Sequence, residues 1–351
     1  MTLTTDFERV SLPLADPFTI SRGTTETAEN VVVRIADGDG TTGVGAAAPS
    51  AYYGETPATV AAVLPDLLAV VERVDDPHAG ARIERELRAT VADNPAARSA
   101  VATAVADLAA KRLDVPLYRQ LGLDPTAAPA TSYTVGMADP EEMARRAERA
   151  VEAGHGILKV KLGGEADRDH ERIEAVRGAA PDARIRVDAN AAWTPRRAVE
   201  TSRVLADHGV EFLEQPVAAD DVDGLRFVRE RGAVAVAADE ACRTAADVPG
   251  LADAADVVVA KLAKCGSLRE VRRVATVARA HGLEPMLGCM VASNAAIAPA
   301  WHLAPAFEYA DLDGSLLLAE DPFEGVPLSG GDPDLTGLDR PGTGAVESGD
   351  S

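Results

Sequence analysis

The sequence GILKVKLGGEADRDHERIEAVRGAAPDARIRVDAN, residues 156–190, decides the fold. It begins and ends with short apolar segments of strand length, GILKVKL (156–162) and RIRVDAN (184–190). The charged segment between them has the length and composition of a surface helix. Two strands joined by a helix are expected to lie parallel to each other in one sheet.

The same alternation of strands and helices continues along the chain from about residue 130. It predicts six further strands at TSYTVG (131–136), VEFLEQP (210–216), AVAVAADE (233–240), DVVVAKL (256–262), EPMLG (284–288) and YADLD (309–313). A period of about 25 residues, repeated about eight times, is typical of a TIM barrel. A doubly wound sheet would also show a glycine-rich fingerprint, which this chain lacks. The predicted fold class is therefore α/β, with a barrel.

Residues 1 to about 125 predict a separate α+β unit. Apolar periodicity predicts strands at 5–14, 30–36 and 42–46 and helices at about 57–73, 79–92 and 96–112. Two polar, glycine-containing segments, 16–27 and 48–56, are expected to be irregular loops. We therefore expect a capping domain over 1–125, completed by residues after about 315, and a barrel domain over 126–315. The tail at 340–351 is expected to be disordered.

The composition excludes several classes of protein. The chain has 35 Lys and Arg residues against 56 Asp and Glu, a formal charge of −21, which would repel nucleic acids and anionic membranes. We expect no membrane span, because no apolar run reaches about 18 residues, and no secretion signal, because the N-terminal MTLTTDFERV lacks a basic stretch followed by an apolar one. Three cysteines without metal-ligand spacing predict a reducing, cytoplasmic location. Only five basic residues are lysines, and this excess of acids predicts a halophilic protein.

Ionisable residues stand at the carboxyl ends of five consecutive predicted barrel strands. They are Lys159 and Lys161, Asp188, Glu214, Asp239, and Lys261. TIM barrels build their active sites at this end of the strands, so these side chains are expected to converge. Three carboxylates from adjacent strands form an oxygen site suited to Mg²⁺, with lysines on either side of it. Lys264 does not share the strand-end phase, and we expect it on the following loop, outside the catalytic set.

These residues resemble the enolase superfamily and, within it, the muconate-lactonizing subgroup. The matching motifs are K-x-K at 159–161, D-x-N at 188–190, E-Q-P at 214–216, D-E at 239–240, and K-L near C-G at 261–266. The resemblance implies a modified (β/α)7β barrel with an N-terminal α+β capping domain. It also implies that the two cap loops at 16–27 and 48–56 close over the mouth of the barrel.

The resemblance also implies roles for single residues. Asp188, Glu214 and Asp239 would hold Mg²⁺, Lys161 and Lys261 would form the acid/base pair, and Lys159 would be an electrostatic helper beside the substrate carboxylate. Asn190 and Glu240 each stand next to one of these carboxylates. They are expected either to orient a ligand or a lysine, or to make ordinary loop-capping hydrogen bonds.

The subgroup contains cycloisomerases, o-succinylbenzoate synthases, N-acylamino acid racemases and dipeptide epimerases. Asp311 and Asp313 share a face of the last strand and resemble the element with which dipeptide epimerases hold the substrate's α-ammonium. The segment GCM (288–290) also resembles these enzymes. The resemblance therefore implies a dipeptide epimerase. Its two lysines would invert the α-carbon of the C-terminal residue by 1,1-proton transfer through a metal-stabilised enediolate.

The cap loops leave the choice of dipeptide open. Arg22 resembles the arginine that alanyl-glutamate epimerases carry for a side-chain carboxylate, whereas Tyr52 and Tyr53 would instead close over an apolar or aromatic side chain. o-Succinylbenzoate synthase, N-acylamino acid racemase and cycloisomerase are the alternative activities. A metal- or ligand-binding barrel without catalysis is the alternative from another class. The expected partner is a small-molecule substrate, and a homo-oligomer is left open.

Overall fold

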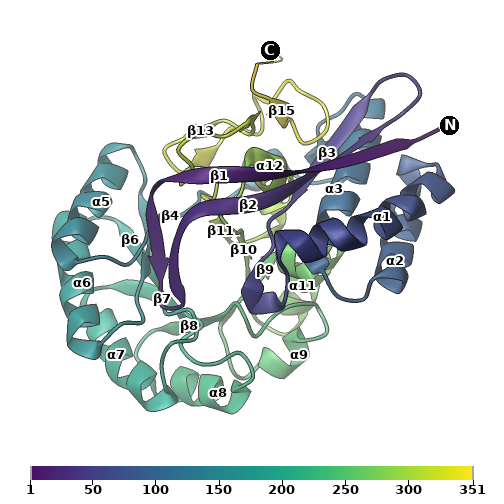
Figure 1. Cartoon of the computed structure of the whole chain (residues 1–351). Coiled ribbons are helices and arrows are strands. Elements are labelled where there is room, and N and C mark those ends of the chain that lie inside the picture. The colour runs from purple at the N-terminus through teal and green to yellow at the C-terminus, as the bar shows by residue number, and fades with distance from the viewer. Residues whose placement is uncertain (1, 350–351) are drawn as a thin grey trace.

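The computed structural model describes residues 2–349 (Figure 1). Its first three strands, β1 (Thr4–Ile20), β2 (Gly23–Ala36) and β3 (Thr42–Ala47), form an antiparallel sheet in this order. After an irregularity between Pro13 and Phe18, the pairing of β1 with β2 continues to the turn at residues 21–22. The prediction of an irregular loop at 16–27 is therefore wrong. Its β-branched residues favour an extended backbone, so the segment forms the tip of a hairpin.

Helices α1 (Pro57–Val74) and α3 (Pro95–Arg112) pack on one face of this sheet, and α2 (Gly80–Thr90) packs against both of them. Strand β3 lies directly against α3 because Gly43 and Gly45 carry no side chain. A Cβ atom on Gly43 would lie 2.1 Å from the carbonyl oxygen of Ala104. Helix α3 is buried along most of its length, so it forms the centre of the apolar core of the cap.

Eight parallel strands form the barrel. They are β4 (Tyr133–Val135), β5 (Ile157–Lys161), β6 (Arg184–Asp188), β7 (Val210–Glu214), β8 (Ala235–Ala238), β9 (Val257–Lys261), β10 (Glu284–Gly288) and β11 (Tyr309–Asp311). Neighbouring strands follow the chain order from β4 to β11. A parallel bridge between Thr131 and Ala310 joins the first strand to the last. The predicted barrel is thus confirmed.

Helices cover the outside of the barrel (Figure 1). They are α5 (Pro140–Glu152), α6 (Ala166–Ala179), α7 (Pro195–Asp207), α8 (Val222–Arg231), α9 (Val248–Leu251), α11 (Leu268–Ala280) and α12 (Asn294–Trp301). The short α10 (Leu262–Cys265) follows β9 directly and packs against α3 of the cap. Local signals fix where they begin. Pro140 and Pro195 stand at first helical positions, and the side chain of Thr194 caps α7. Across residues 2–349, no helix combines the length and the apolar character that a membrane crossing needs.

The remaining elements are short. They are α4 (Leu117–Gln120), the 3-10 turns Ala51–Tyr53, Pro77–Ala79, Pro125–Ala127 and Ala304–Ala306, and the strand pairs β12 (Phe323–Glu324) with β15 (Val346–Glu347) and β13 (Leu328–Ser329) with β14 (Asp332–Pro333). In contrast to the predicted disorder, residues 342–345 are buried against the rest of the chain. Thr343 is buried and donates its main-chain N–H to Asp107 in α3 at 2.6 Å. Residues 350–351 lie outside the described part of the chain.

The β1–β2 hairpin runs across one end of the barrel (Figure 1). Close to its tip, the carbonyl oxygen of Thr19 accepts a hydrogen bond from the N–H of Met137, in the loop after β4, at 2.8 Å. Further along β1, the N–H of Ala15 donates to the carbonyl oxygen of Leu317 at 3.0 Å. The hairpin is therefore fastened over the carboxyl ends of the barrel strands. The domain boundaries near residues 125 and 315 stay a prediction.

Candidate active site

Strand register brings the predicted site residues together. Lys161 pairs with Asp188 across β5 and β6, and Asp188 pairs with Glu214 across β6 and β7. On the other side of the barrel, Gly288 at the end of β10 pairs with both Lys261 and Asp311. Because all these residues end parallel strands, their side chains meet at one edge of the barrel.

Lysines and carboxylates are interleaved at this edge. Nζ of Lys161 lies 2.6 Å from Oδ2 of Asp188, and Nζ of Lys261 lies 2.7 Å from Oδ2 of Asp239. Lys159 lies deeper, with its Nζ 2.7 Å from Oδ2 of Asp311, 2.8 Å from Oε2 of Glu214 and 3.3 Å from Oδ2 of Asp188. All these residues are at most 8% exposed, so the charges interact with little screening by water.

Burial and neighbouring charges shift the pKa values of these groups. Burial lowers the pKa of Lys159, but the attraction of its carboxylate partners outweighs this effect and holds the pKa well above its ordinary value. Burial raises the pKa of Asp188, yet the two nearby lysines hold it below its usual range. For Glu214, burial is the larger effect and raises the pKa to about 8.

Lys264, which the sequence reasoning left out, belongs to this network. It lies in α10 directly after β9, is buried, and places its Nζ 2.5 Å from Oδ1 of Asp239. The expectation that Lys264 lies on a loop outside the site is therefore wrong. Its spacing from Lys261 differs from the strand period because the chain turns into a helix at Leu262. The scarcity of lysine in this chain is the signal that could have identified it.

The donor set fits a divalent cation. Asp188, Glu214 and Asp239 are buried carboxylates on adjacent strand ends, which is the oxygen donor set that Mg²⁺ prefers. Nζ of Lys159 donates to Oε1 of Glu214 at 2.9 Å and lies 2.8 Å from the buried Oε2, so one lysine faces both carboxylate oxygens. As the side chains stand, no three acids among residues 2–349 surround a single point, since each carboxylate turns toward a lysine.

Asp311 and Asp313 both line the cavity but differ in their surroundings. Asp311 is paired with Lys159 and accepts a hydrogen bond from the hydroxyl of Ser132 at 2.5 Å. Asp313 accepts the main-chain N–H of Thr134 at 2.6 Å. Burial and the neighbouring Asp311 raise the pKa of Asp313 to about 7. Of the two, Asp311 pairs directly with Lys159, whereas the hydrogen-bond partner of Asp313 is a neutral main-chain N–H, so Asp313 would gain more from a cation beside it.

Two family matches cover most of the chain. Residues 3–122 match the family described as "Mandelate racemase / muconate lactonizing enzyme, N-terminal domain", and residues 142–348 match "Enolase C-terminal domain-like". The chain belongs to the mandelate racemase/muconate lactonizing enzyme family. The resemblance to the enolase superfamily inferred from the strand-end motifs is thereby confirmed.

Several curated relatives of this chain are epimerases. The chain is 35% identical to the L-Ala-D/L-Glu epimerase of Bacteroides thetaiotaomicron over 96% of this chain and 86% of that protein. It is 38% identical to the L-Lys-D/L-Arg epimerase of Methylococcus capsulatus over 95% of this chain and 96% of that protein. A similar solved structure is the dipeptide epimerase of Enterococcus faecalis complexed with Mg and L-Leu-L-Tyr. It has a TM-score of 0.91, 32% identity, and coverage of 98% and 99%.

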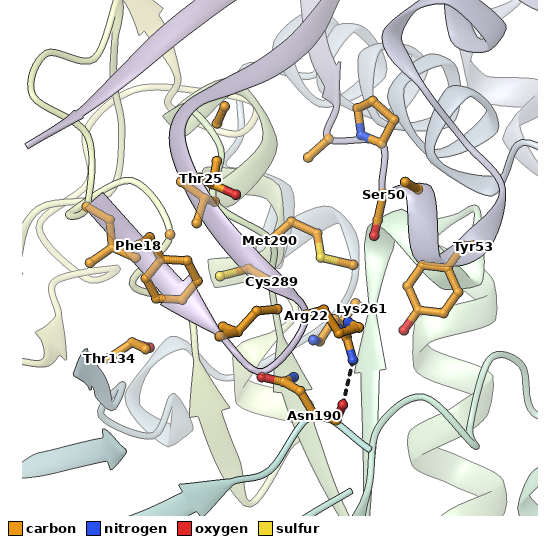
Figure 2. Close-up of a pocket in the computed structure, with 18 of the residues that line it drawn as sticks. Phe18, Arg22, Thr25, Ser50, Tyr53, Thr134, Asn190, Lys261, Cys289 and Met290 are labelled. Carbon is orange, nitrogen blue, oxygen red and sulfur yellow. Dashed lines mark hydrogen bonds between the residues drawn. The ribbon is translucent and has the colours of Figure 1, made fainter. Parts of the chain in front are cut away.

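In this family member, the cavity above the strand ends has a volume of about 410 Å³. Figure 2 shows Phe18 on the hairpin side of the cavity and Tyr53 on the side of the second cap loop, with Lys261 between them. Phe18, Ile20, Tyr53 and Met290 give the cavity an apolar part. Sequence reasoning did not identify Phe18, because it assigned residues 16–27 to a loop.

Arg22 joins the cap to the barrel. From the turn between β1 and β2, its Nη1 donates to Oε1 of Glu240 at 2.8 Å. It also donates to the carbonyl oxygen of Asn190 at 2.9 Å (Figure 2). Its guanidinium lies 4.5 Å from the centre of the Tyr52 ring. Asn190 also donates its side-chain amide to Asp188 at 3.1 Å. The cap thus contacts the site through a continuous set of hydrogen bonds.

Proposed function

We propose that this family member is a Mg²⁺-dependent dipeptide epimerase that inverts the α-carbon of the C-terminal residue. One observation carries the proposal: Lys161 and Lys261 reach the cavity from β5 and β9, and each is held by a different buried carboxylate. Two bases on separate strands are what inversion of a carbon centre requires. Two epimerases that are 35% and 38% identical to this chain over nearly its whole length support the same reaction.

The two lysines move the proton. One lysine, as a neutral amine, accepts the proton of the α-carbon. The other lysine, as an ammonium, donates a proton to the opposite face of the same carbon. Burial lowers the pKa of Lys261, but the attraction of Asp239 outweighs this and raises the pKa above its ordinary value. Lys261 therefore needs a competing positive charge on Asp239 before it can act as the base.

Asp188, Glu214 and Asp239 are the residues that would hold Mg²⁺. When bound, the ion would supply that competing charge and stabilise the negative charge that develops on the substrate carboxylate. Lys159, which lies deeper in the barrel, contacts Glu214 and Asp188 and adds a positive charge beside them. Its role in the proposal is electrostatic, because its pKa keeps it charged.

Asp313 is proposed to hold the α-ammonium of the dipeptide. Its carboxylate lines the cavity, and a cationic group beside it would offset the burial that raises its pKa. Asp311 is proposed to assist Asp313, and its own carboxylate is paired with Lys159. Arg22 is proposed to contribute to substrate selection, through its place at the rim of the cavity.

The proposal is tested with a library of dipeptides, Mg²⁺ and deuterated water at high salt, with mass spectrometry as the readout. A substrate gains one deuterium as both epimers appear. Exchange into no dipeptide would contradict the proposal. In parallel, loss of water from the o-succinylbenzoate precursor would indicate the synthase, and exchange only into N-acyl amino acids would indicate the racemase.

The acidic, lysine-poor surface supports a further proposal, that the protein is halophilic and works in the cytoplasm. Screening by concentrated salt reduces repulsion among its carboxylates. We expect the midpoint of thermal unfolding to rise between 0.1 and about 2 M KCl. A midpoint that does not change over this range would contradict halophilic adaptation. Light scattering in the same buffers reports whether the chain forms a homo-oligomer.

A further inference from the structure

Each of the two proposed catalytic lysines is held by a carboxylate, and each of these carboxylates has a further partner. Asp188, which holds Lys161, accepts the main-chain N–H of Asn190 at 2.8 Å and its side-chain amide at 3.1 Å. Asp239, which holds Lys261 through Oδ2, accepts a hydrogen bond from Lys264 on Oδ1. The two catalytic lysines are therefore oriented by two separate sets of contacts.

Lys264 approaches Asp239 from the side of a second cavity. This cavity has a volume of about 680 Å³ and lies between the cap helices α2 and α3 and the barrel, where Arg98 and Glu270 also line it. The Lys264 side chain is fully buried. Besides the carboxylate, its Nζ contacts the main-chain carbonyl oxygen of Asp239 at 2.5 Å. Two contacts to one residue restrict rotation of the Asp239 side chain.

We propose that Lys264 is a positioning residue that turns Oδ2 of Asp239 toward Lys261, and that it thereby governs proton transfer on one face of the substrate only. This inference rests on the proposed function. Asp188 is oriented by the two donors of Asn190 and by Lys159, so the Lys161 face does not depend on Lys264. A residue that merely supported the fold or the metal site would affect both faces equally.

The chemistry of Lys264 suits this role. An ammonium carries three donors, so one side chain can meet both Oδ1 and the carbonyl oxygen of Asp239. Asp239 is buried between Lys261 on one oxygen and Lys264 on the other. Without Lys264, a buried carboxylate oxygen would lose its donor and the carboxylate would be free to turn.

The test measures deuterium exchange into each epimer of a dipeptide separately. Lys261→Ala first identifies the epimer that depends on Lys261. Lys264→Met, which keeps the side-chain volume, should then lower exchange of that epimer roughly 10- to 100-fold more than exchange of the other. Asn190→Gly is the matched variant for the Lys161 face, since glycine tolerates the φ of 46° at this position. It should produce the opposite asymmetry.

Rescue provides the control for folding. Lys264→Ala leaves space that faces the second cavity, so added methylammonium should restore exchange of the affected epimer and leave the other unchanged. Lys264→Gln retains a donor and should show the same asymmetry to a smaller extent. Equal loss on both faces, or loss on the Lys161 face, in any soluble Lys264 variant would overturn the proposal.

A crystal structure of Lys264→Met tests the positioning without reference to activity. We expect the Asp239 carboxylate to turn, so that the contact between Oδ2 and Nζ of Lys261, 2.7 Å in the native chain, is broken. An unchanged contact would overturn the proposal. If instead the native enzyme exchanges no dipeptide at all, the proposed function fails, while this structural result still decides whether Lys264 positions Asp239.

Discussion

Nζ of Lys161 lies 2.6 Å from Oδ2 of Asp188, its register partner on the adjacent barrel strand. A proposed proton-transfer group and a proposed metal ligand are thus fixed relative to each other by main-chain pairing, with no loop between them. Groups carried by strands are held more accurately than groups carried by loops. The pair therefore provides a rigid face of the site.

Lys161→Ala and Lys261→Ala should each abolish epimerisation, because inversion needs a proton donor and an acceptor on opposite faces. Each variant should still exchange the α-hydrogen of one epimer, the one whose hydrogen faces the remaining lysine. The measurement is proton NMR of each pure epimer in deuterated water. Full epimerisation by either variant would refute the assignment of these two lysines.

Asp188→Ala, Glu214→Ala and Asp239→Ala should each weaken Mg²⁺ binding, since a missing charged ligand leaves the cation undercoordinated. The measurement is calorimetric titration of the metal, with activity assayed alongside. Excess chelator should remove activity from the native protein, and added Mg²⁺ should restore it. Activity that persists in chelator would count against a metal enzyme. Glu142→Ala on α5, where the carboxylate is half-buried and pairs with Arg145, is the control and should bind Mg²⁺ normally.

The barrel and the strand-end residues were predictable because one physical pattern controls both. A buried strand must be apolar, and the chemical groups of a parallel barrel stand where each strand ends, so Lys161 and Asp188 are visible in the sequence. The hairpin tip at 16–27 was not predictable in the same way, since its polar Thr residues lack apolar alternation. Its pairing depends on contacts such as Thr19 with Met137, far along the chain.

The place of Lys264 in the site and the packing of the C-terminal segment could not be predicted either, because both depend on tertiary contacts. The helix that begins at Leu262 directs the Lys264 side chain toward Asp239, and this direction cannot be predicted from the spacing of residues in the sequence. Thr343 lies in a Gly-rich segment whose composition is typical of disorder, yet it is buried against α3. The composition of a segment indicates whether it would be ordered in isolation, whereas its contacts with the rest of the chain determine whether it is ordered in the folded protein.

Arg22→Met should loosen the closure of the cap, because it removes the contacts with Glu240 and the carbonyl of Asn190. The Arg22 side chain is 35% exposed, so we expect only about a fivefold rise in KM, the equivalent of about 1 kcal/mol. Steady-state kinetics with several dipeptides gives the result. A rise confined to dipeptides with an acidic side chain would instead identify Arg22 as their carboxylate partner. Arg145→Met, an exposed position on α5, is the control.

His302 should make stability depend on pH. Nδ1 of His302 accepts the N–H of Tyr118 at 3.0 Å, and Nε2 lies 3.0 Å from the carbonyl oxygen of Thr343. Burial lowers the pKa of His302 to about 4, while the unfolded value is about 6.5. Between these values the unfolded chain binds more protons, so stability is lost as the pH falls from about 6.5 to about 4.

The loss attributable to His302 should reach roughly 3 kcal/mol at the acid end of this window. Denaturant unfolding of the native chain and of His302→Gln at pH 7 and pH 4.5 isolates it from other titrating groups. The free energy of unfolding should decrease less for the variant than for the native chain. Equal decreases would show that His302 titrates normally in the folded protein.

Asp311 and Asp313 should respond differently to loss of their charge. Asp311 is paired with Lys159, so Asp311→Asn should leave a buried lysine with one fewer partner and disturb Glu214 and Asp188 beside it. Its effect should therefore extend to every substrate, with or without an ammonium. The comparison of the two Asn variants separates a general defect of the site from a defect in recognition.

Asp313→Asn should impair only substrates with a free α-ammonium. Asp313 lines the cavity and has a neutral main-chain donor, Thr134, as its partner, so a substrate cation would supply its countercharge. Loss of a charge-assisted contact of about 1.5–3 kcal/mol predicts a roughly 10- to 150-fold fall in kcat/KM for a free dipeptide. The N-acetylated dipeptide has no ammonium, so it should be a poor substrate of the native enzyme and should lose nothing further in the variant. Were the native enzyme to turn over the acetylated and free dipeptides equally well, Asp313 would not bind an ammonium. The activity would then be that of an N-acylamino acid racemase or an o-succinylbenzoate synthase.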